Sequence, residues 1–335
     1  MQSPVRRVVI LGASGREFHD FNTLYRDKPD HHVVAFATTR APAFDGRRYP
    51  SALAGSLYPG GIPIVPEDGL EELIRREMVD LCVFSRSDVA HVDVMHAAER
   101  AIAAGADFLL LGADRTMLKA KVPVVAVTSA SASAGRSETT LYVARLLQEQ
   151  GLRVVVVRNT MPAGNVATQA WKRYATPADL GSGVRSIEER EECDALLGDG
   201  FVVYAGVDYG KILKCAESEA DVILWDGAKA DLPFFVPDLH ICVADPRRPG
   251  LETAYHPGEA NFRRADVILV STCDVADEGD VYAVEIVCAK LNPKARVICA
   301  LLPVVGDRLV LREVAPGRLA EELARVVPVA AGAAR

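Results

Sequence analysis

The chain has 335 residues, half of them hydrophobic and a quarter charged, and its net charge at pH 7 is −7. This length is enough for about two domains of an ordinary globular protein. The acidic balance argues against a nucleic-acid-binding protein, which normally carries a basic surface. Apolar runs are too short for a membrane span or a signal peptide. Seven scattered cysteines without a C-x-x-C pair argue against a zinc site and are typical of thiols in a reducing cytoplasm.

Short apolar strands alternate with helical stretches in the first third of the chain. We expect strands at 8–11, 32–37, 79–84 and 108–111, and helices at 70–77 and 89–104. Such alternation predicts a parallel sheet with helices on both faces. We therefore expect an α/β protein whose N-terminal Rossmann-like domain covers residues 1–118. Lys119, Lys121 and Pro123 interrupt the pattern and indicate a hinge at 119–123.

Two ligand sites are conceivable in this first domain. Gly12 and Gly15 follow the first strand, as in a dinucleotide site, but the third glycine and the acid that binds the ribose are missing. Arg40 could accept a 2′-phosphate instead, so an NADP-linked oxidoreductase stays open. A basic cluster suits a small, multiply anionic substrate, although solvated loop charges would look the same. Its members are Arg16, His19, Arg47 and Arg48.

The strongest pattern begins at Val124, where VVAVTSASASAGRSETT runs from an apolar strand through small residues into a helix. Strand, tight loop and helix N-terminus form a phosphate-binding loop, because backbone N–H groups and the positive helix end face an anion. In the usual G-x-x-x-x-G-K-[ST] pattern, Ala130 replaces the first glycine and Arg136 replaces the lysine. Guanidinium binds phosphate well but is bulkier than an ammonium, so nucleotide binding is better supported than fast hydrolysis. The expected nucleotide-binding residues are Ser133, Ala134, Gly135, Arg136, Ser137, Glu138 and Thr139, although Thr139 could simply cap its helix.

A phosphate-binding loop needs a metal partner, which an apolar strand ending in Asp normally supplies. The run VILWDG ends in Asp226 and Gly227, so Ser137 and Asp226 are expected to hold Mg²⁺. Guanine-specific relatives carry Asn-Lys-x-Asp after a later strand. Only Asp274 fits that pattern here. Asp274 is therefore expected among the nucleotide-binding residues, while guanine selectivity is doubtful.

The remaining elements predict a P-loop NTPase-type parallel-sheet domain over residues 124–329, with a frayed tail at 330–335. Strands are expected at 153–157, 202–204, 221–225, 239–244, 267–271, 297–302 and 309–311, and helices from 136 to 148, 209 to 217 and 317 to 327. Residues 159–200 look polar and loop-rich.

Several segments carry a family resemblance. They are Gly15-Arg16-x-Phe18-His19-x-Phe21-Asn22, Asp45-Gly46-Arg47-Arg48-Tyr49-Pro50, Met161-Pro162-x-Gly164, Ile187-Glu188-Glu189-Arg190-Glu191-Glu192, Tyr204-Ala205-Gly206-Val207-Asp208-Tyr209, Leu224-Trp225-Asp226-Gly227, Asp245-Pro246-x-Arg248-Pro249-Gly250 and Pro257-Gly258-Glu259-x-Asn261. Over about residues 6–300 the chain resembles cyclic 2,3-diphosphoglycerate synthetase and its uncharacterised relatives. The resemblance implies ATP, Mg²⁺ and the cyclisation of 2,3-diphosphoglycerate through a phosphoanhydride. It also implies that Arg248 joins the first-domain cations around the substrate.

The chain departs from that family at the nucleotide site. The family's Gly-x-Gly-Lys-Ser reads Ser-Ala-Gly-Arg-Ser at 133–137, its Arg-His-Pro-Met-Pro reads Arg-Asn-Thr-Met-Pro at 158–162, and a Gly-Asn-Asn-Asp-like stretch reads Ala-Lys-Ala-Asp at 228–231. A glycine-rich C-terminal segment is not found. We therefore expect a divergent ATP-dependent ligase, cyclase or phosphotransferase that acts on a small anionic substrate.

Acid–base or second-metal candidates in this enzyme are Asp208 and Asp231, with Arg136 on the phosphate, although either acid could be a cap or a surface residue. The competing hypothesis is a nucleotide or metabolite sensor without turnover. No nucleic-acid or membrane partner is expected, and a homo-oligomer is compatible with the sequence.

Overall fold

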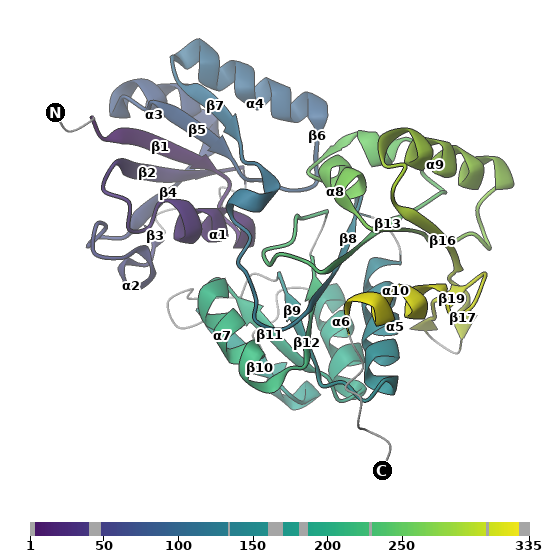
Figure 1. The fold of residues 1–335 in the computed structure, drawn as a ribbon. Coiled ribbons are helices and arrows are strands. Elements are labelled where there is room, and N and C mark those ends of the chain that lie inside the picture. Colours follow the sequence, from purple (N-terminus) through teal and green to yellow (C-terminus); the bar gives the residue numbers. More distant parts are fainter. Residues whose placement is uncertain are drawn as a thin grey trace.

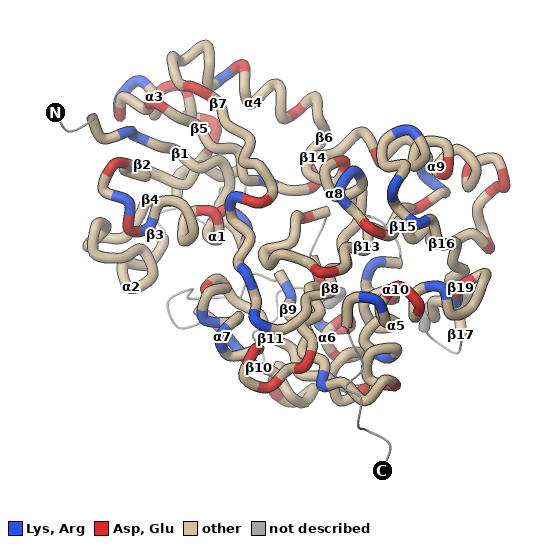
Figure 2. The backbone as a smooth tube through the Cα atoms, in the orientation of Figure 1, with Lys and Arg blue, Asp and Glu red and all other residues tan. Residues whose placement is uncertain are grey.

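The computed structural model describes residues 4–39, 48–132, 135–159, 170–180, 187–227, 230–305 and 308–327. The chain is a mixed α/β protein with two parallel-sheet domains, as the alternating pattern predicts (Figure 1). Basic and acidic residues are interspersed along both domains (Figure 2). None of the helices within these ranges has the length and apolar character that crossing a bilayer demands.

The first sheet has the strand order β3-β4-β2-β1-β5-β7. Its parallel strands are β1 (Arg6–Leu11), β2 (His31–Thr38), β4 (Ile62–Pro66), β5 (Leu81–Phe84) and β7 (Asp107–Leu110), and β3 (Arg48–Tyr49) is an antiparallel edge. Val8 and Ile10 of β1 pack on the face covered by α1 (Gly15–Leu24) and α2 (Ser51–Ala54). Val9 and Leu11 pack on the face of α3 (Leu70–Glu77) and α4 (His91–Ala104).

The second sheet has nine strands in the order β10-β11-β9-β12-β8-β13-β15-β16-β19. Its parallel strands are β8 (Val124–Ser129), β9 (Val154–Arg158), β11 (Val202–Gly206), β12 (Val222–Asp226), β13 (Leu239–Ala244), β15 (Val267–Val270) and β16 (Arg296–Leu301). The edges β10 (Trp171–Tyr174) and β19 (Arg312–Glu313) are antiparallel. β8 is buried throughout, as its unbroken apolar run predicts for a central parallel strand.

Helices cover both faces of this second sheet. The helices on one face are α5 (Arg136–Glu149), α6 (Ile187–Gly198) and α10 (Arg318–Val326). Those on the other face are α7 (Tyr209–Glu219), α8 (Gly258–Arg264) and α9 (Glu278–Leu291). The smaller strand pairs are β6 (Val89–Ala90) with β14 (Tyr255–His256) and β17 (Val304–Val305) with β18 (Arg308–Leu309). Short 3-10 turns lie at Glu67–Gly69, Ala113–Arg115, Pro177–Leu180 and Leu251–Thr253.

The structure differs from the sequence-based expectations at several elements. The segment 159–200, expected to be loop-rich, contains β10 and the helix α6. Acidic residues are frequent in the sequence of α6, and within 190–198 the buried apolar contacts come from Cys193, Leu196 and Leu197, so its helical period is weak. The helix expected from 89 starts at His91, because Val89 and Ala90 pair with β14. α9 was not predicted, and β18 covers 308–309 rather than 309–311.

The two domains contact each other through several elements. β6 of the first domain pairs antiparallel with β14 of the second. Leu118 forms a parallel bridge with Phe235. The His19 ring of α1 stacks on Phe234, with ring centroids 4.1 Å apart. The start of α1 therefore lies against the second domain, next to the segment that follows β12.

Candidate phosphate-binding site

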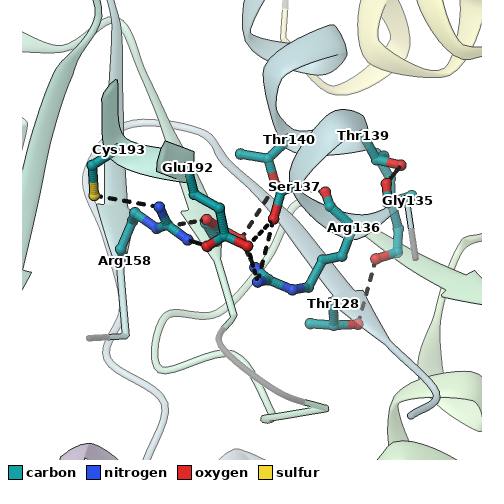
Figure 3. A network of polar contacts seen from close by, with 11 residues as sticks. Thr128, Gly135, Arg136, Ser137, Thr139, Thr140, Arg158, Glu192 and Cys193 are labelled. Carbon is teal, nitrogen blue, oxygen red and sulfur yellow. Dashed lines mark hydrogen bonds and ion pairs between the residues drawn. The ribbon is translucent and has the colours of Figure 1, made fainter. Parts of the chain in front are cut away.

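The candidate site lies where β8, β12 and β9 end. These strands are parallel neighbours, so their carboxyl ends meet at one edge of the sheet, which is where α/β proteins bind ligands. β8 leads into the loop that ends at Gly135, and α5 starts there. β12 ends at Asp226 and β9 at Arg158. The structure thus brings the start of α5, drawn in Figure 3, together with the predicted metal ligand Asp226, which accepts a hydrogen bond from Arg136.

Gly135 is the residue before α5 and requires the absence of a side chain. Its φ is +99°, and an added Cβ would lie 2.8 Å from the Cβ of Ser271. The Thr139 hydroxyl and amide both donate to the Gly135 carbonyl, at 2.5 and 2.8 Å. Thr139 therefore makes a local helix contact. Glu138 is half-buried, and burial raises its pKa. Ser133 and Ala134 lie outside the described residues.

Asp226 is the centre of a polar network at this edge. Its carboxylate is 1% exposed. Oδ1 accepts a hydrogen bond from Arg136 Nη1 and one from the Thr140 hydroxyl at 3.3 Å. Oδ2 lies 2.8 Å from Arg158 Nε. The residue predicted to bind Mg²⁺ is thus in contact with two guanidinium groups.

Glu192 of α6 completes the network. It accepts hydrogen bonds from the Ser137 hydroxyl at 2.5 Å and from Arg158 Nη2, and Arg136 Nη2 lies 3.5 Å away. Burial alone would raise the pKa of Glu192, but the charges of Arg158 and Arg136 hold it below the ordinary value. Burial alone would lower the pKa of Arg158, and the charge of Asp226 raises it above the ordinary value. The positive charges of the two arginines therefore balance the negative charges of the two carboxylates.

The oxygen donors here fit a magnesium ion that is bound together with a nucleotide. The described ranges contain no group of three or more His, Cys, Asp or Glu that could hold a metal unaided. Asp226, Glu192 and Ser137 nevertheless offer hard oxygen donors in one cluster, and Mg²⁺ commonly takes its other ligands from water and substrate phosphates. Among the described atoms, Asp226 Oδ2 is buried without a hydrogen bond. A metal on Asp226 would displace at least one guanidinium.

No family model matches the sequence. The chain is 52% identical over 303 residues to arginine synthetase ArcE of Thermococcus kodakarensis (strain ATCC BAA-918 / JCM 12380 / KOD1), which covers 90% of this chain and 68% of that protein. The chain belongs to the arginine synthetase ArcE family. The resemblance to cyclic 2,3-diphosphoglycerate synthetase thus leads to a relative with a different named activity.

Two solved structures have partial likeness to this ArcE family member. One is LpxK from Aquifex aeolicus in complex with ATP, with 18% identity, a TM-score of 0.38 and coverage of 55% of this chain and 56% of that chain. The other is a chain of the MinC:MinD cell division protein complex of Aquifex aeolicus, with 15% identity, a TM-score of 0.30 and coverage of 55% and 83%. Neither likeness bears on the chemistry of the site.

The predicted basic cluster of the first domain is only partly assembled. Arg16 is buried against the second domain, 3.5 Å from Asp231 and 3.6 Å from Asp20. His19 is not the cation that the sequence suggested, because burial lowers its pKa to about 3 and its Nε2 lies 2.7 Å from the Thr116 carbonyl. Arg48 donates instead to the carbonyls of Gly60 and Gly61. Arg47 lies outside the described residues.

The other predicted site residues lie in separate places. Asp208 caps α7 by accepting from the Lys211 amide at 3.0 Å. Asp274 is exposed and accepts from the Leu302 amide at 3.0 Å. Arg248 is exposed in the turn after β13.

Asp231 lies buried between the two domains. Besides Arg16, it accepts hydrogen bonds from the Ser87 hydroxyl at 2.5 Å and from the Asn159 amide group. Burial raises its pKa to about 6. Asn159 directly follows Arg158, so Asp231 is connected through one residue to the network around Asp226.

The glycine-rich turn after β1 is already occupied by an acid. Gly12 has φ +112°, and an added Cβ would lie 2.0 Å from Glu17 Oε1. The Glu17 carboxylate accepts from the Ser14 amide at 2.9 Å and from its hydroxyl at 2.7 Å. A buried carboxylate thus sits at the helix N-terminus where a dinucleotide pyrophosphate would bind. This arrangement counts against an NADP site, and Arg40 lies outside the described residues.

Sequence reasoning missed three residues that organise the site. Arg158 is the one charged residue of an otherwise all-valine strand, which is a signal that was available. Glu192 is hidden in an acidic run that does not indicate which acid turns inward. Asn261 of α8 is fully buried, and its amide group donates to the carbonyls of three residues, one at the end of β8 and two in the segment after β12. These are Ser129 at 3.4 Å, and Ala230 and Asp231 at 3.0 Å each.

Proposed function

We propose that this chain is an ATP-dependent synthetase that forms arginine or a closely related amino acid, with Mg²⁺ bound beside the nucleotide. The observation that carries the proposal is the meeting of Arg136, Ser137 and Asp226 at one sheet edge. It occurs in a chain 52% identical to a protein named arginine synthetase. Seven free thiols agree with a cytoplasmic enzyme.

The chemistry follows from what an arginine-forming synthetase must do. Arginine carries a guanidinium group, and its oxygen counterpart is a ureido group. Transfer of the terminal phosphoryl group of ATP to the ureido oxygen yields ADP and turns that oxygen into a leaving group. Ammonia then attacks the same carbon, the C–O bond breaks, inorganic phosphate leaves, and a proton is lost to give arginine.

The residues of the site have distinct roles in this proposal. The loop amides and Arg136 bind the nucleotide phosphates, because guanidinium and helix N-terminal N–H groups suit phosphate. Ser137 and Asp226 would hold Mg²⁺, which when bound neutralises phosphate charge. Asp231, with a pKa raised to about 6, is an acid–base candidate near neutral pH. Arg16 is the first-domain cation nearest to it.

The first domain is then the substrate domain. Its parallel strands occur in the spatial order β4-β2-β1-β5-β7, which supports a Rossmann-like assignment. We retain residues 1–118 and 124–329 as the proposed domains. Activation of a phosphate of 2,3-diphosphoglycerate would use the same nucleotide site, and the sequence motifs favour it as a second substrate class.

A sensor without turnover is the alternative that one observation favours. Arg136 pairs with Asp226, so both partners are engaged within the protein. Such a network could bind nucleotide by exchanging partners and still lack the geometry for transfer, which depends on fractions of an ångström.

An assay with ATP, Mg²⁺ and a substrate panel tests the proposal. The panel contains citrulline with ammonium, ornithine with ammonium, and 2,3-diphosphoglycerate. ADP and phosphate are measured by coupled enzymes and products by mass spectrometry. We expect ADP and arginine in equal amounts from citrulline, and none from the Asp226→Asn variant. ATP binding without ADP from any substrate would favour the sensor and count against the synthetase.

A further inference from the structure

We propose that Arg158 is a second phosphate-binding cation of the nucleotide site, bound by Glu192 and Asp226 until magnesium and nucleotide take over those carboxylates. The inference rests on the proposed nucleotide site. It concerns a residue at the end of β9, outside the phosphate-binding loop and absent from the usual loop motif. Figure 3 shows its guanidinium directed toward Glu192 and the start of α5.

The position of Arg158 is fixed by the sheet. Its Cα is the register partner of Asp226 on the neighbouring parallel strand. The side chain is 2% exposed and also donates to the Cys193 sulfur at 3.3 Å. A buried guanidinium is costly unless anions accompany it, and Arg158 has two carboxylates. A charged group on a strand end is therefore preorganised beside the predicted metal ligand.

The contact between Arg158 and Asp226 is suited to exchange. Arg158 Nε and Asp226 Oδ2 are 2.8 Å apart, yet neither atom makes a hydrogen bond with good geometry to any described atom. The ion pair is thus held by the attraction of opposite charges and not by a directional hydrogen bond. Asp226 also contacts Arg136, so one carboxylate holds two guanidinium groups at rest.

Binding of a nucleotide together with Mg²⁺ would replace each ion pair of this network with an equivalent one. Asp226, Ser137 and Glu192 offer oxygen atoms to the metal, which leaves Arg136 and Arg158 without their internal anions. Phosphate oxygens accept the forked N–H groups of arginine well. The protein would therefore exchange salt bridges without leaving a buried charge unpaired.

The strand order indicates which phosphate Arg158 would reach. β9 lies two strands from β8, with β12 between them, so the end of β9 is about 10 Å from the end of β8. In the proposed site the amides at the start of α5 bind the inner phosphates. Arg158 lies beyond β12 from them, on the side of α6, and we assign it to the terminal phosphate. It should therefore distinguish ATP from ADP, which a purely structural arginine would not do.

Calorimetric titration of the full chain with ATP and with ADP, each with Mg²⁺, tests this discrimination. We expect Arg158→Gln to weaken ATP binding about tenfold or more and ADP binding less than about threefold. The control is Arg153→Gln, which removes an exposed ion pair with Asp221 at the other end of the same strand and should change neither. Equal losses for ATP and ADP would overturn the inference. Absence of ATP binding by the unaltered chain would instead refute the proposed nucleotide site itself.

A second variant removes the internal competitor and keeps Arg158, so it decides the matter if Arg158→Gln does not fold. In Glu192→Gln the arginines lose one resting anion. We expect ATP, titrated in EDTA without metal, to bind the Glu192→Gln variant several times more tightly than it binds the unaltered chain. The reason is that the arginines must give up fewer internal ion pairs before they can bind phosphate. Unchanged or weaker metal-free binding in Glu192→Gln would overturn the inference.

Discussion

Arg136 illustrates how one residue changes the meaning of a motif. A lysine at this place would offer a compact charge on a flexible stem, whereas a guanidinium presents a rigid fork. Here the fork spans Asp226 and Glu192, which lie on different elements. The substitution therefore adds links between β12, α5 and α6, and in the proposed function nucleotide binding requires these ion pairs to exchange partners.

Glu17 gives a prediction for the pH dependence of stability. Burial raises its pKa from 4.5 to about 7, so the folded chain keeps a proton that the unfolded chain releases above about pH 4.5. The stability that protonated Glu17 gives to the folded chain is thus fully present below pH 4.5 and is lost as pH rises toward 7. We expect Glu17→Gln, which cannot ionise, to gain stability relative to the unaltered chain over this range, by up to about 3 kcal/mol.

Urea denaturation of both chains at pH 4.5, 6, 7 and 8 measures this difference. The pKa of Asp231 is raised like that of Glu17, so its contribution to stability also falls as pH rises. The pKa of His19 is lowered and its ring is neutral in the folded chain, so its contribution falls as pH falls. Both residues are present in each chain, so subtraction removes what they contribute on their own and leaves the effect of Glu17, which includes its repulsion by Asp231. Parallel stability curves for the two chains would contradict the assignment.

At the scale of elements, α8 contacts the candidate phosphate loop from outside. Asn261 binds carbonyls on both sides of the site, and a Cβ on Gly258 would lie 1.6 Å from the Ala130 carbonyl oxygen. The helix therefore begins with a glycine because the loop backbone passes directly over it.

Gly258→Ala should displace the loop and weaken ATP binding about tenfold, with a smaller effect on the helix itself. The matched control is Gly279→Ala in α9, where nothing lies within 4 Å of an added Cβ. Both variants are measured by calorimetric titration and by thermal unfolding. A loop that tolerates the added methyl would give the same affinity in both variants.

Most elements could be predicted from sequence because parallel strands buried on both faces are continuous apolar runs. Strand β13 was predicted with its observed bounds, Leu239–Ala244. The helix α6 could not be predicted, because Glu192 in its acidic run pairs with Arg158 of the candidate site and adds no apolar residue to the helical pattern. The pairing of Glu192 with Ser137 joins residues 55 positions apart, and no local pattern records such a contact.

At the scale of the molecule, the two domains share a polar and aromatic interface. Arg16, His19 and Ser87 of the first domain bind Asp231, Phe234 and their neighbours in the second. β6 and β14 add a second contact beside α8. The chain segment at 119–123 is therefore one of several connections, and the domains are coupled by buried side chains.

This coupling predicts a single cooperative unfolding transition for both sheets. Far-UV circular dichroism and tyrosine–tryptophan fluorescence should give the same urea midpoint. Arg16→Gln removes the cation that pairs with buried Asp231, and it should separate the two urea midpoints or lower both. Two distinct transitions in the unaltered chain would mean that the domains fold independently.

The chain has two tryptophans, and their surroundings differ sharply. Trp171 is 37% exposed on the edge strand β10. Trp225 is fully buried, directly precedes Asp226, and packs on Phe234, which in turn stacks on His19. The blue-shifted part of the intrinsic emission therefore comes from an indole set between Asp226, the predicted metal ligand, and the domain interface. The emission of Trp225 can therefore be used to follow ligand binding and domain contact without an added fluorescent label.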